Sequence, residues 1–115
     1  MTDLAIRPAS VLPDVSTAAA ALAHLLAIRP DLAHLPVRWE VDLDGTINPR
    51  IEVDHPEGCT ATLLLAEALE ITPNTSTFRG LDGIERQTLR VEGRWGGTTW
   101  CCITYAILDL TGGAA

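Results

Sequence analysis

The segment from Val37 to Val53, VRWEVDLDGTINPRIEV, constrains the fold most, because apolar and polar residues alternate on both sides of one Asp-Gly pair. Such alternation predicts two strands joined by a tight turn. A two-residue turn at residues 44–45 would put apolar and polar side chains on the same face. A three-residue loop at residues 43–45 pairs Asp42 with Thr46, and it places the apolar side chains on one face and the polar side chains on the other. The second register is therefore the one that we predict.

This register gives the hairpin one apolar and one polar face. The apolar face consists of Val37, Trp39, Val41, Ile47, Pro49, Ile51 and Val53, and the polar face of Arg38, Glu40, Asp42, Asn48, Arg50 and Glu52. Since Pro49 has no backbone N–H to donate, we expect the return strand at a sheet edge.

Two segments beside this hairpin have helical periodicity. Residues Val15–Ile28 are rich in Ala and Leu, place apolar residues at helical spacing and stop at Pro30. A second helix is expected to begin near Pro56, to run through CTATLLLAEALE and to end before Pro73.

The C-terminal part of the sequence predicts a second hairpin. Residues Glu85–Arg94 alternate, a Gly-Gly pair comes next, and TTWCCITYAIL completes the pattern. A three-residue loop at residues 95–97 pairs Val91 with Cys101. The expected buried face is then Leu89, Val91, Cys101, Ile103, Tyr105 and Ile107.

The last strand of this hairpin is apolar on both faces. In the register above, Trp100 and Cys102 lie on the face opposite to the core. A strand of this kind is either central in its sheet or in contact with another chain. The open face of the sheet is expected to carry Arg38, Glu40, Arg90, Glu92 and Trp100.

These elements predict an α+β fold in the order α-β-β-α-β-β. The simplest packing places the two helices on one face of a four-stranded, mostly antiparallel sheet, and the order also allows two αββ halves. A chain of 115 residues should form one domain. We expect this domain at residues 14–110, a flexible arm at residues 1–13 and a disordered tail at residues 111–115.

Composition narrows the classes of partner and location. The formal net charge of -7 argues against a nucleic-acid backbone as partner, because phosphate binding needs clustered Lys or Arg. All eight basic residues are arginine, which together with frequent Ala, Leu and Asp indicates a high-GC bacterial gene. The sequence has neither a membrane-spanning run nor a signal-peptide pattern at its start, so we expect a cytoplasmic protein.

The stretch VDLDGTI, Val41–Ile47, resembles the nucleophile motif of the haloacid-dehalogenase-like phosphatases. The resemblance implies that Asp42 attacks phosphorus and that Asp44 is the general acid and base. These phosphatases also need a crossover helix after the motif and a later acidic pair for Mg²⁺. Here an antiparallel strand is predicted next, so we interpret the motif as a turn in which Asp and Gly serve backbone geometry.

His55 and the three cysteines allow two further hypotheses. The i, i+4 spacing of His55 and Cys59 at a helix start suits zinc ligation with Cys101 or Cys102, and it also suits a Cys–His nucleophile. However, adjacent cysteines in a strand point to opposite faces, and no Cys-x-x-Cys is present. Buried free thiols are the preferred interpretation, and no metal or other cofactor is expected.

The preferred candidate site combines tryptophan and arginine. Trp95 lies at a Gly-rich hairpin tip, and Trp100 and Cys102 are expected on the open face near Arg90 and Arg94. Tryptophan and arginine are typical of interface hot spots. We therefore predict a binding surface for another protein, most simply a second copy of the chain.

The runs ALAHLLAIRPDLAHLP and GRWGGTTWCCITYAI, in this helix–hairpin–helix–hairpin layout, resemble small uncharacterised actinobacterial proteins, many of them from mobile elements or phages. The resemblance implies a fold and a genomic neighbourhood but no catalytic residues. The expected function is a non-catalytic, acidic protein-binding or regulatory module that forms a homodimer. The alternatives are a small-molecule-binding regulator with a pocket between helices and sheet, or a small enzyme that uses Cys59 and His55.

Overall fold

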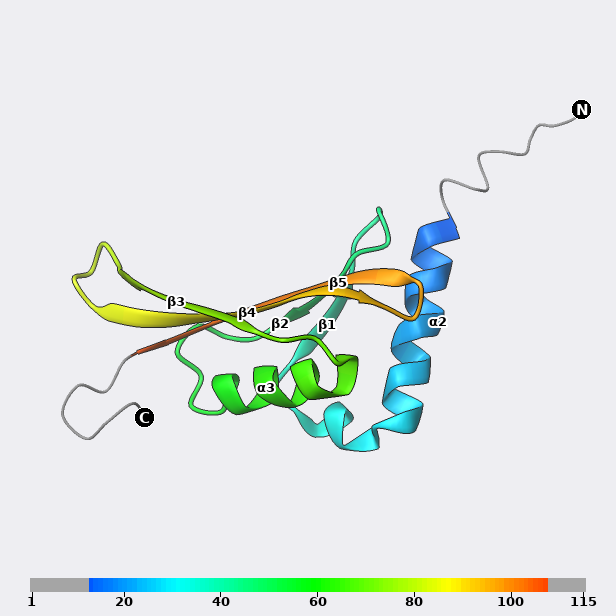
Figure 1. The fold of residues 1–115 in the computed structure, drawn as a ribbon, viewed down its shortest axis with the longest axis horizontal. Coiled ribbons are helices and arrows are strands. Elements are labelled where there is room, and N and C mark those ends of the chain that lie inside the picture. Colours follow the sequence, from blue (N-terminus) through cyan, green and yellow to red (C-terminus); the bar gives the residue numbers. More distant parts are fainter. Residues whose placement is uncertain (1–12, 108–115) are drawn as a thin grey trace, which may run out of the picture.

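A computed structural model describes residues 13–107 of the chain (Figure 1). The predicted arm, apart from its last residue, and the predicted tail lie outside these residues. The elements are α2 (Pro13–Ile28), the 3-10 helix η2 (Pro30–His34), β1 (Arg38–Val41), β2 (Ile47–Arg50), α3 (Gly58–Leu69), β3 (Asn74–Arg79), β4 (Glu85–Trp95) and β5 (Thr98–Ile107). Within the described ranges, no helix has the length and apolar character needed to cross a membrane.

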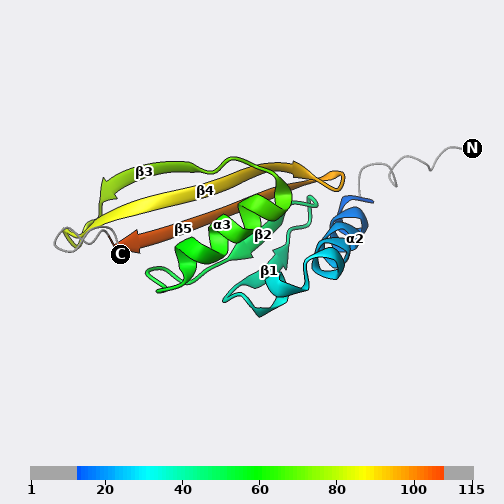
Figure 2. The same cartoon turned by 60° about the horizontal axis from the view of Figure 1, so that its bottom comes forward.

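The five strands form one mixed sheet in the order β1-β2-β5-β4-β3 (Figure 2). Neighbouring strands are antiparallel except β2 and β5, which are parallel. The α+β class and the two helices were predicted correctly, whereas the prediction of four strands is wrong. The missed strand is β3, whose sequence NTSTFR is exposed at every position and therefore lacks the apolar alternation on which the prediction depended.

The register predicted for the first hairpin is confirmed. The N–H of Asp42 donates to the carbonyl of Thr46 at 2.8 Å, and the N–H of Gly45 donates to the carbonyl of Asp42 at 2.9 Å. Gly45 has a φ of 88°, a left-handed conformation that favours glycine. The Leu-Asp-Gly segment is thus a three-residue loop.

The same three residues form the same turn between β3 and β4. In this Leu-Asp-Gly loop the N–H of Gly80 donates to the carbonyl of Ile84 at 2.9 Å, and Gly83 has a φ of 80°. In each loop the aspartate carboxylate accepts a hydrogen bond from the backbone N–H two residues further on. Asp82 accepts from Ile84 at 3.0 Å, and Asp44 accepts from Thr46 at 2.9 Å. The repeated motif is therefore a turn-forming sequence.

The prediction that Pro49 places the return strand at a sheet edge is wrong, because β2 lies between β1 and β5. The pairing of β2 with β5 is confined to one position, Ile47 opposite Trp100. Pro49 lies beyond that position, so the missing N–H interrupts no further pairing with β5.

The register predicted for the second hairpin is wrong by one residue. Trp95 pairs with Thr98 across a two-residue turn, and Val91 pairs with Cys102. Both glycines of the turn, at residues 96–97, have positive φ values of 65° and 82°, as a two-residue hairpin loop of this kind requires. The shift turns every residue of β5 to the opposite face from the one predicted.

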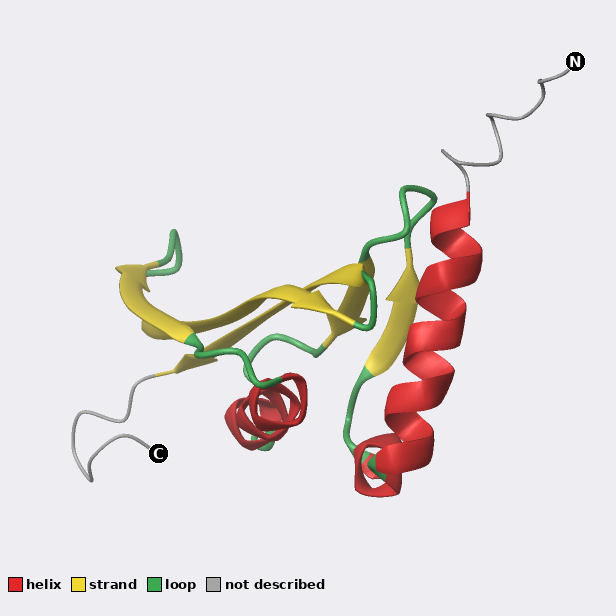
Figure 3. Ribbon diagram, turned by 45° about the vertical axis from the view of Figure 1, so that its right-hand side comes forward, coloured by secondary structure: helices red, strands yellow, loops and turns green. Residues whose placement is uncertain are grey.

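Both helices cover one face of the sheet, and the other face is free of described helices (Figure 3). The core between them consists of Ala18, Ala21, Leu25, Leu32, Ile47, Leu65, Ala66, Leu69, Val91, Trp100 and Cys102. The uncovered face, called the open face below, is formed by the alternate residues Arg38, Glu40, Asn48, Arg50, Asn74, Ser76, Phe78, Thr88, Arg90, Glu92, Arg94, Cys101, Ile103 and Tyr105.

Candidate functional site

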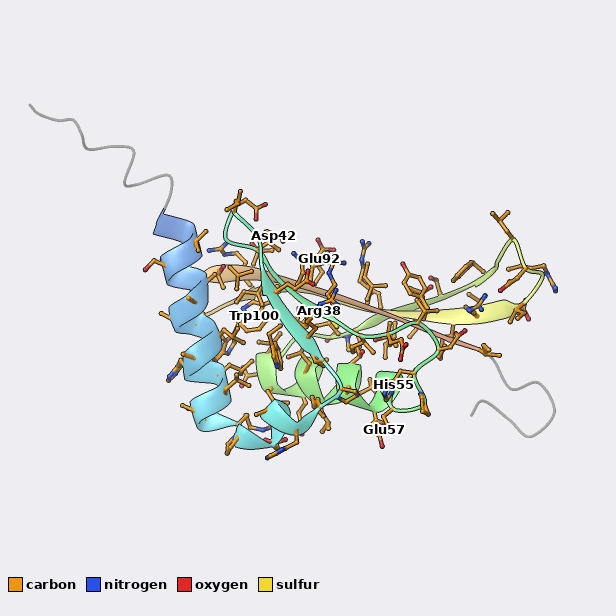
Figure 4. The ribbon with its side chains drawn as sticks, turned by 180° about the vertical axis from the view of Figure 1, so that it is seen from behind. Arg38, Asp42, His55, Glu57, Glu92 and Trp100 are labelled. Atoms are coloured by element: carbon orange, nitrogen blue, oxygen red, sulfur yellow. The ribbon has the colours of Figure 1, made fainter. Side chains whose placement is uncertain are left out.

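Trp100 and Cys102, two of the predicted interface residues, belong to the core. Their side chains are 0% and 1% exposed, and Figure 4 shows Trp100 on the helix side of the sheet. The predicted exposed position of Trp100 is therefore wrong, as a consequence of the shifted register of β5. Burial also raises the pKa of Cys102 to about 11, so this cysteine stays a neutral thiol near pH 7.

Trp95 is half-buried and links the tip of the second hairpin to α2. Its ring stacks on His24 with a centroid distance of 5.7 Å and meets Trp100 edge-to-face at 6.0 Å. The carbonyl of Trp95 accepts the indole N–H of Trp100 at 2.9 Å. These internal contacts explain the positions of both tryptophan side chains, so neither side chain indicates an interface with another chain.

The arginines predicted for the open face do lie there. Arg94 is held at the hairpin tip, where it donates to the Thr99 hydroxyl at 3.1 Å and to the Gly97 carbonyl at 2.9 Å. Arg90 is held less tightly: its side chain is 49% exposed, and its nearest charged partner is Glu92 at 3.7 Å. Among the described residues no hydrogen bond involves the Arg90 guanidinium, so its donors are available to a ligand.

The neighbouring charges at the β1–β2 end of the open face are paired. Arg38 and Arg50 both donate to the carboxylate of Glu40, at 2.6 Å and 3.1 Å. These two hydrogen bonds lower the pKa of Glu40. Two guanidinium groups share one carboxylate, so this end of the face keeps a net charge of +1, but its three charged side chains are already engaged in hydrogen bonds with one another, unlike the guanidinium of Arg90.

The two aspartates of VDLDGTI are used within their own hairpin. The backbone N–H of Thr46 donates to Asp44 and lowers the pKa of that carboxyl, and Asp42 accepts the side-chain amide of Asn48 at 2.5 Å. The next strand returns antiparallel, where the phosphatases need a crossover helix. The interpretation of this motif as a turn is confirmed.

His55 and Cys59 line one cavity of about 290 Å³ beside Asp54. Nδ1 of His55 accepts the N–H of Glu57 at 3.0 Å, so a neutral His55 carries its proton on Nε2 and has no free nitrogen to deprotonate a thiol. Asp54 is engaged with Arg86, through two contacts of 3.0 Å. Within residues 13–107, no cluster of three or more His, Cys, Asp or Glu side chains offers a metal site. This arrangement gives no support to a Cys–His nucleophile.

Two hollows on the open face flank a ridge formed by Ile103 and Tyr105 of β5. The larger, about 420 Å³, is lined by Asn74, Thr75, Ser76, Phe78, Thr88, Arg90, Ile103 and Tyr105. The smaller, about 220 Å³, is lined by Pro49, Arg50, Ile51, Val53, Ile103 and Tyr105. In the larger hollow, called the β3–β5 hollow below, the ring of Phe78 meets that of Tyr105 edge-to-face at 5.9 Å.

The two edges of the sheet differ in how they are protected. β1 is four residues long and carries two charged side chains, Arg38 and Glu40. β3 is six residues long, contains neither proline nor lysine, and has one charged residue, Arg79, at its end. Natural edge strands are kept from pairing by short length and by charged side chains. β3 is longer than β1 and has fewer charged side chains. The sequence-based prediction missed this edge, although its Thr-rich run between Pro73 and a Leu-Asp-Gly turn was a usable signal.

The chain matches no protein-family model, no curated protein and no solved structure. The resemblance to small actinobacterial proteins therefore stays a prediction. Among the described residues, the exposed edge strand β3 and the β3–β5 hollow beside it are the candidate sites.

Proposed function

We propose that this protein is a non-catalytic, acidic module that binds protein and forms a homodimer, by pairing β3 of one copy with β3 of another. The observation that supports the proposal is the exposed β3 edge, which carries unpaired backbone groups and almost no charge. Such an edge is a template for an added strand. A cytoplasmic location belongs to the same proposal.

The backbone groups available for pairing are determined by the turn at the end of β3. The N–H of Gly80 points to β4, where it donates to Ile84. Because antiparallel partners alternate between hydrogen-bonded and non-hydrogen-bonded pairs, the N–H and C=O groups of Thr75, Thr77 and Arg79 point away from β4. Three consecutive outward positions are thus free to receive a strand.

The register that uses all three positions has its two-fold axis at Thr77. Thr77 then lies opposite Thr77 of the second copy, and Thr75 lies opposite Arg79. Each opposed pair exchanges two hydrogen bonds, which gives about six across the interface. Opposed threonines are a favourable cross-strand pair.

Charge and exposed apolar surface are compatible with this arrangement. The two copies of Arg79 lie at opposite ends of the paired strands, so they do not repel at close range. Leu81 is fully exposed in the turn after β3, near the end of the paired strands. In this register the open faces of the two copies become continuous.

We expect light scattering after size-exclusion chromatography to give twice the chain mass of 12.3 kDa. Dilution should shift the population toward the monomer by mass action. Addition of salt should leave the dimer largely intact, because its contacts are mainly backbone hydrogen bonds rather than ion pairs. A monomer at every concentration would contradict the proposal.

A further inference from the structure

We propose that the β3–β5 hollow binds a small monocarboxylate that carries an aromatic or similarly flat apolar group. The hollow has an apolar end and a cationic end, and its size is within the range of small-molecule sites. The alternative of a small-molecule-binding regulator expected a pocket between helices and sheet, whereas this hollow lies on the open face. This inference goes beyond homodimer formation and stands without it.

The apolar end consists of the rings of Phe78 and Tyr105, and Ile103, the third apolar residue of the lining, lies opposite Arg90. The edge-to-face arrangement of Phe78 and Tyr105 leaves ring surface directed into the hollow, and Phe78 is 41% exposed. A large aromatic side chain at this exposure leaves apolar surface in contact with water. A flat ring placed on these side chains removes that surface from water and gains aromatic contacts.

The cationic end is built around Arg90. Asn74 lies directly opposite Arg90 on β3, and Ser76 lies opposite Thr88 one pair further on. All four side chains line the hollow. They supply a guanidinium, an amide and two hydroxyls, which are the groups that bind a carboxylate by charge-assisted and neutral hydrogen bonds.

The spacing of the two ends sets the length of the ligand. Tyr105 lies opposite Thr88 and Ile103 lies opposite Arg90, so the aromatic and cationic ends are two residues apart along β4. Two residues of strand correspond to about 7 Å. This distance suits a carboxylate separated from a ring by two or three bonds.

Glu92 restricts the charge of the ligand. Its carboxylate lies 3.7 Å from Nε of Arg90, so the pair is nearly neutral before anything binds. A single negative charge on the other side of the guanidinium is accommodated, whereas a phosphate dianion is repelled by Glu92. The chemistry therefore selects a monocarboxylate, supplied either by a free metabolite or by the C-terminus of a peptide that ends in an aromatic residue.

The test is a titration of the ¹⁵N-labelled full chain with N-acetylphenylalanine and with its uncharged amide. We expect the carboxylate to shift the backbone resonances of Thr88, Arg90, Ile103 and Tyr105, and to bind about tenfold more tightly than the amide. A short peptide ending in phenylalanine forms a third arm. Tighter binding of this peptide than of N-acetylphenylalanine identifies a polypeptide terminus as the source, and equal binding identifies a small carboxylate.

Two matched variants separate a specific site from bulk charge. Arg90→Gln should abolish the preference for the carboxylate. Arg94→Gln, which makes the same charge change on the same strand and face but outside the hollow, should retain it. Equal binding of carboxylate and amide, absence of shifts at the hollow, or equal losses in the two variants would overturn the inference. The preference for the carboxylate over the amide should persist in a β3 variant that is monomeric. A failure of the ligand-binding inference is therefore distinguishable from a failure of the proposed dimer.

Discussion

Replacement of Trp100 by alanine is expected to lower the free energy of unfolding by about 3–5 kcal/mol. The indole is 0% exposed, lies in the core shared by both helices, and donates to the carbonyl of Trp95. Truncation leaves a large cavity and removes this hydrogen bond. Since a domain of this size is stable by about 5–15 kcal/mol, the loss is a large part of the total.

Urea denaturation followed by circular dichroism measures this change without using the fluorescence of the deleted residue. Phe78→Ala is the matched control, because this aromatic side chain is partly exposed on the open face and should contribute less than Trp100. The comparison also tests the register of β5. If Trp100 were on the open face, its replacement would cost no more than that of Phe78.

Thr77→Pro is expected to convert the homodimer to a monomer while the fold is retained. Proline removes the N–H of residue 77, which points away from β4, and so removes one donor from each copy at the two-fold axis. Two lost hydrogen bonds at about 1 kcal/mol each weaken dimerisation by about 30-fold, and the proline ring adds steric hindrance. Sedimentation equilibrium of the two proteins measures the change.

Ser76→Pro is the matched control for this substitution. The N–H of Ser76 points to β4, so proline there should destabilise the β3–β4 hairpin. Thr77→Lys tests the same axis by charge, because two lysines would face each other across it. A dimer that withstands both Thr77→Pro and Thr77→Lys would not be formed through β3.

The two hairpins explain how much of the fold the sequence could predict. The first has one apolar and one polar face, so a shift of one residue would bury charge, and this alone selects the register of Val41 opposite Ile47. In the second hairpin β5 is apolar on both faces, and both registers bury apolar side chains. The choice there depended on whether the Gly-Gly pair forms a two-residue or a three-residue loop, which alternation does not decide.

The candidate site was predictable only in part for a related reason. Arg90 and Arg94 were placed on the open face because β4 alternates clearly. Phe78 and Tyr105 were missed because their meeting depends on β3 as a full strand and on the true register of β5. Exposed edge strands have no buried face, so they lack the pattern by which strands are recognised in a sequence.

Disulfide cross-linking of Thr77→Cys tests the proposed dimer most directly. Opposed residues of a hydrogen-bonded antiparallel pair have Cα atoms about 5.5 Å apart, a distance that a disulfide can span. Under mild oxidation, the Thr77→Cys protein should form a covalent dimer on a non-reducing gel. The wild type, with its own three cysteines, and Ala23→Cys, on the exposed surface of α2, should stay mainly monomeric on the same gel. Equal cross-linking of Thr77→Cys and Ala23→Cys, or none at residue 77, would contradict pairing through β3.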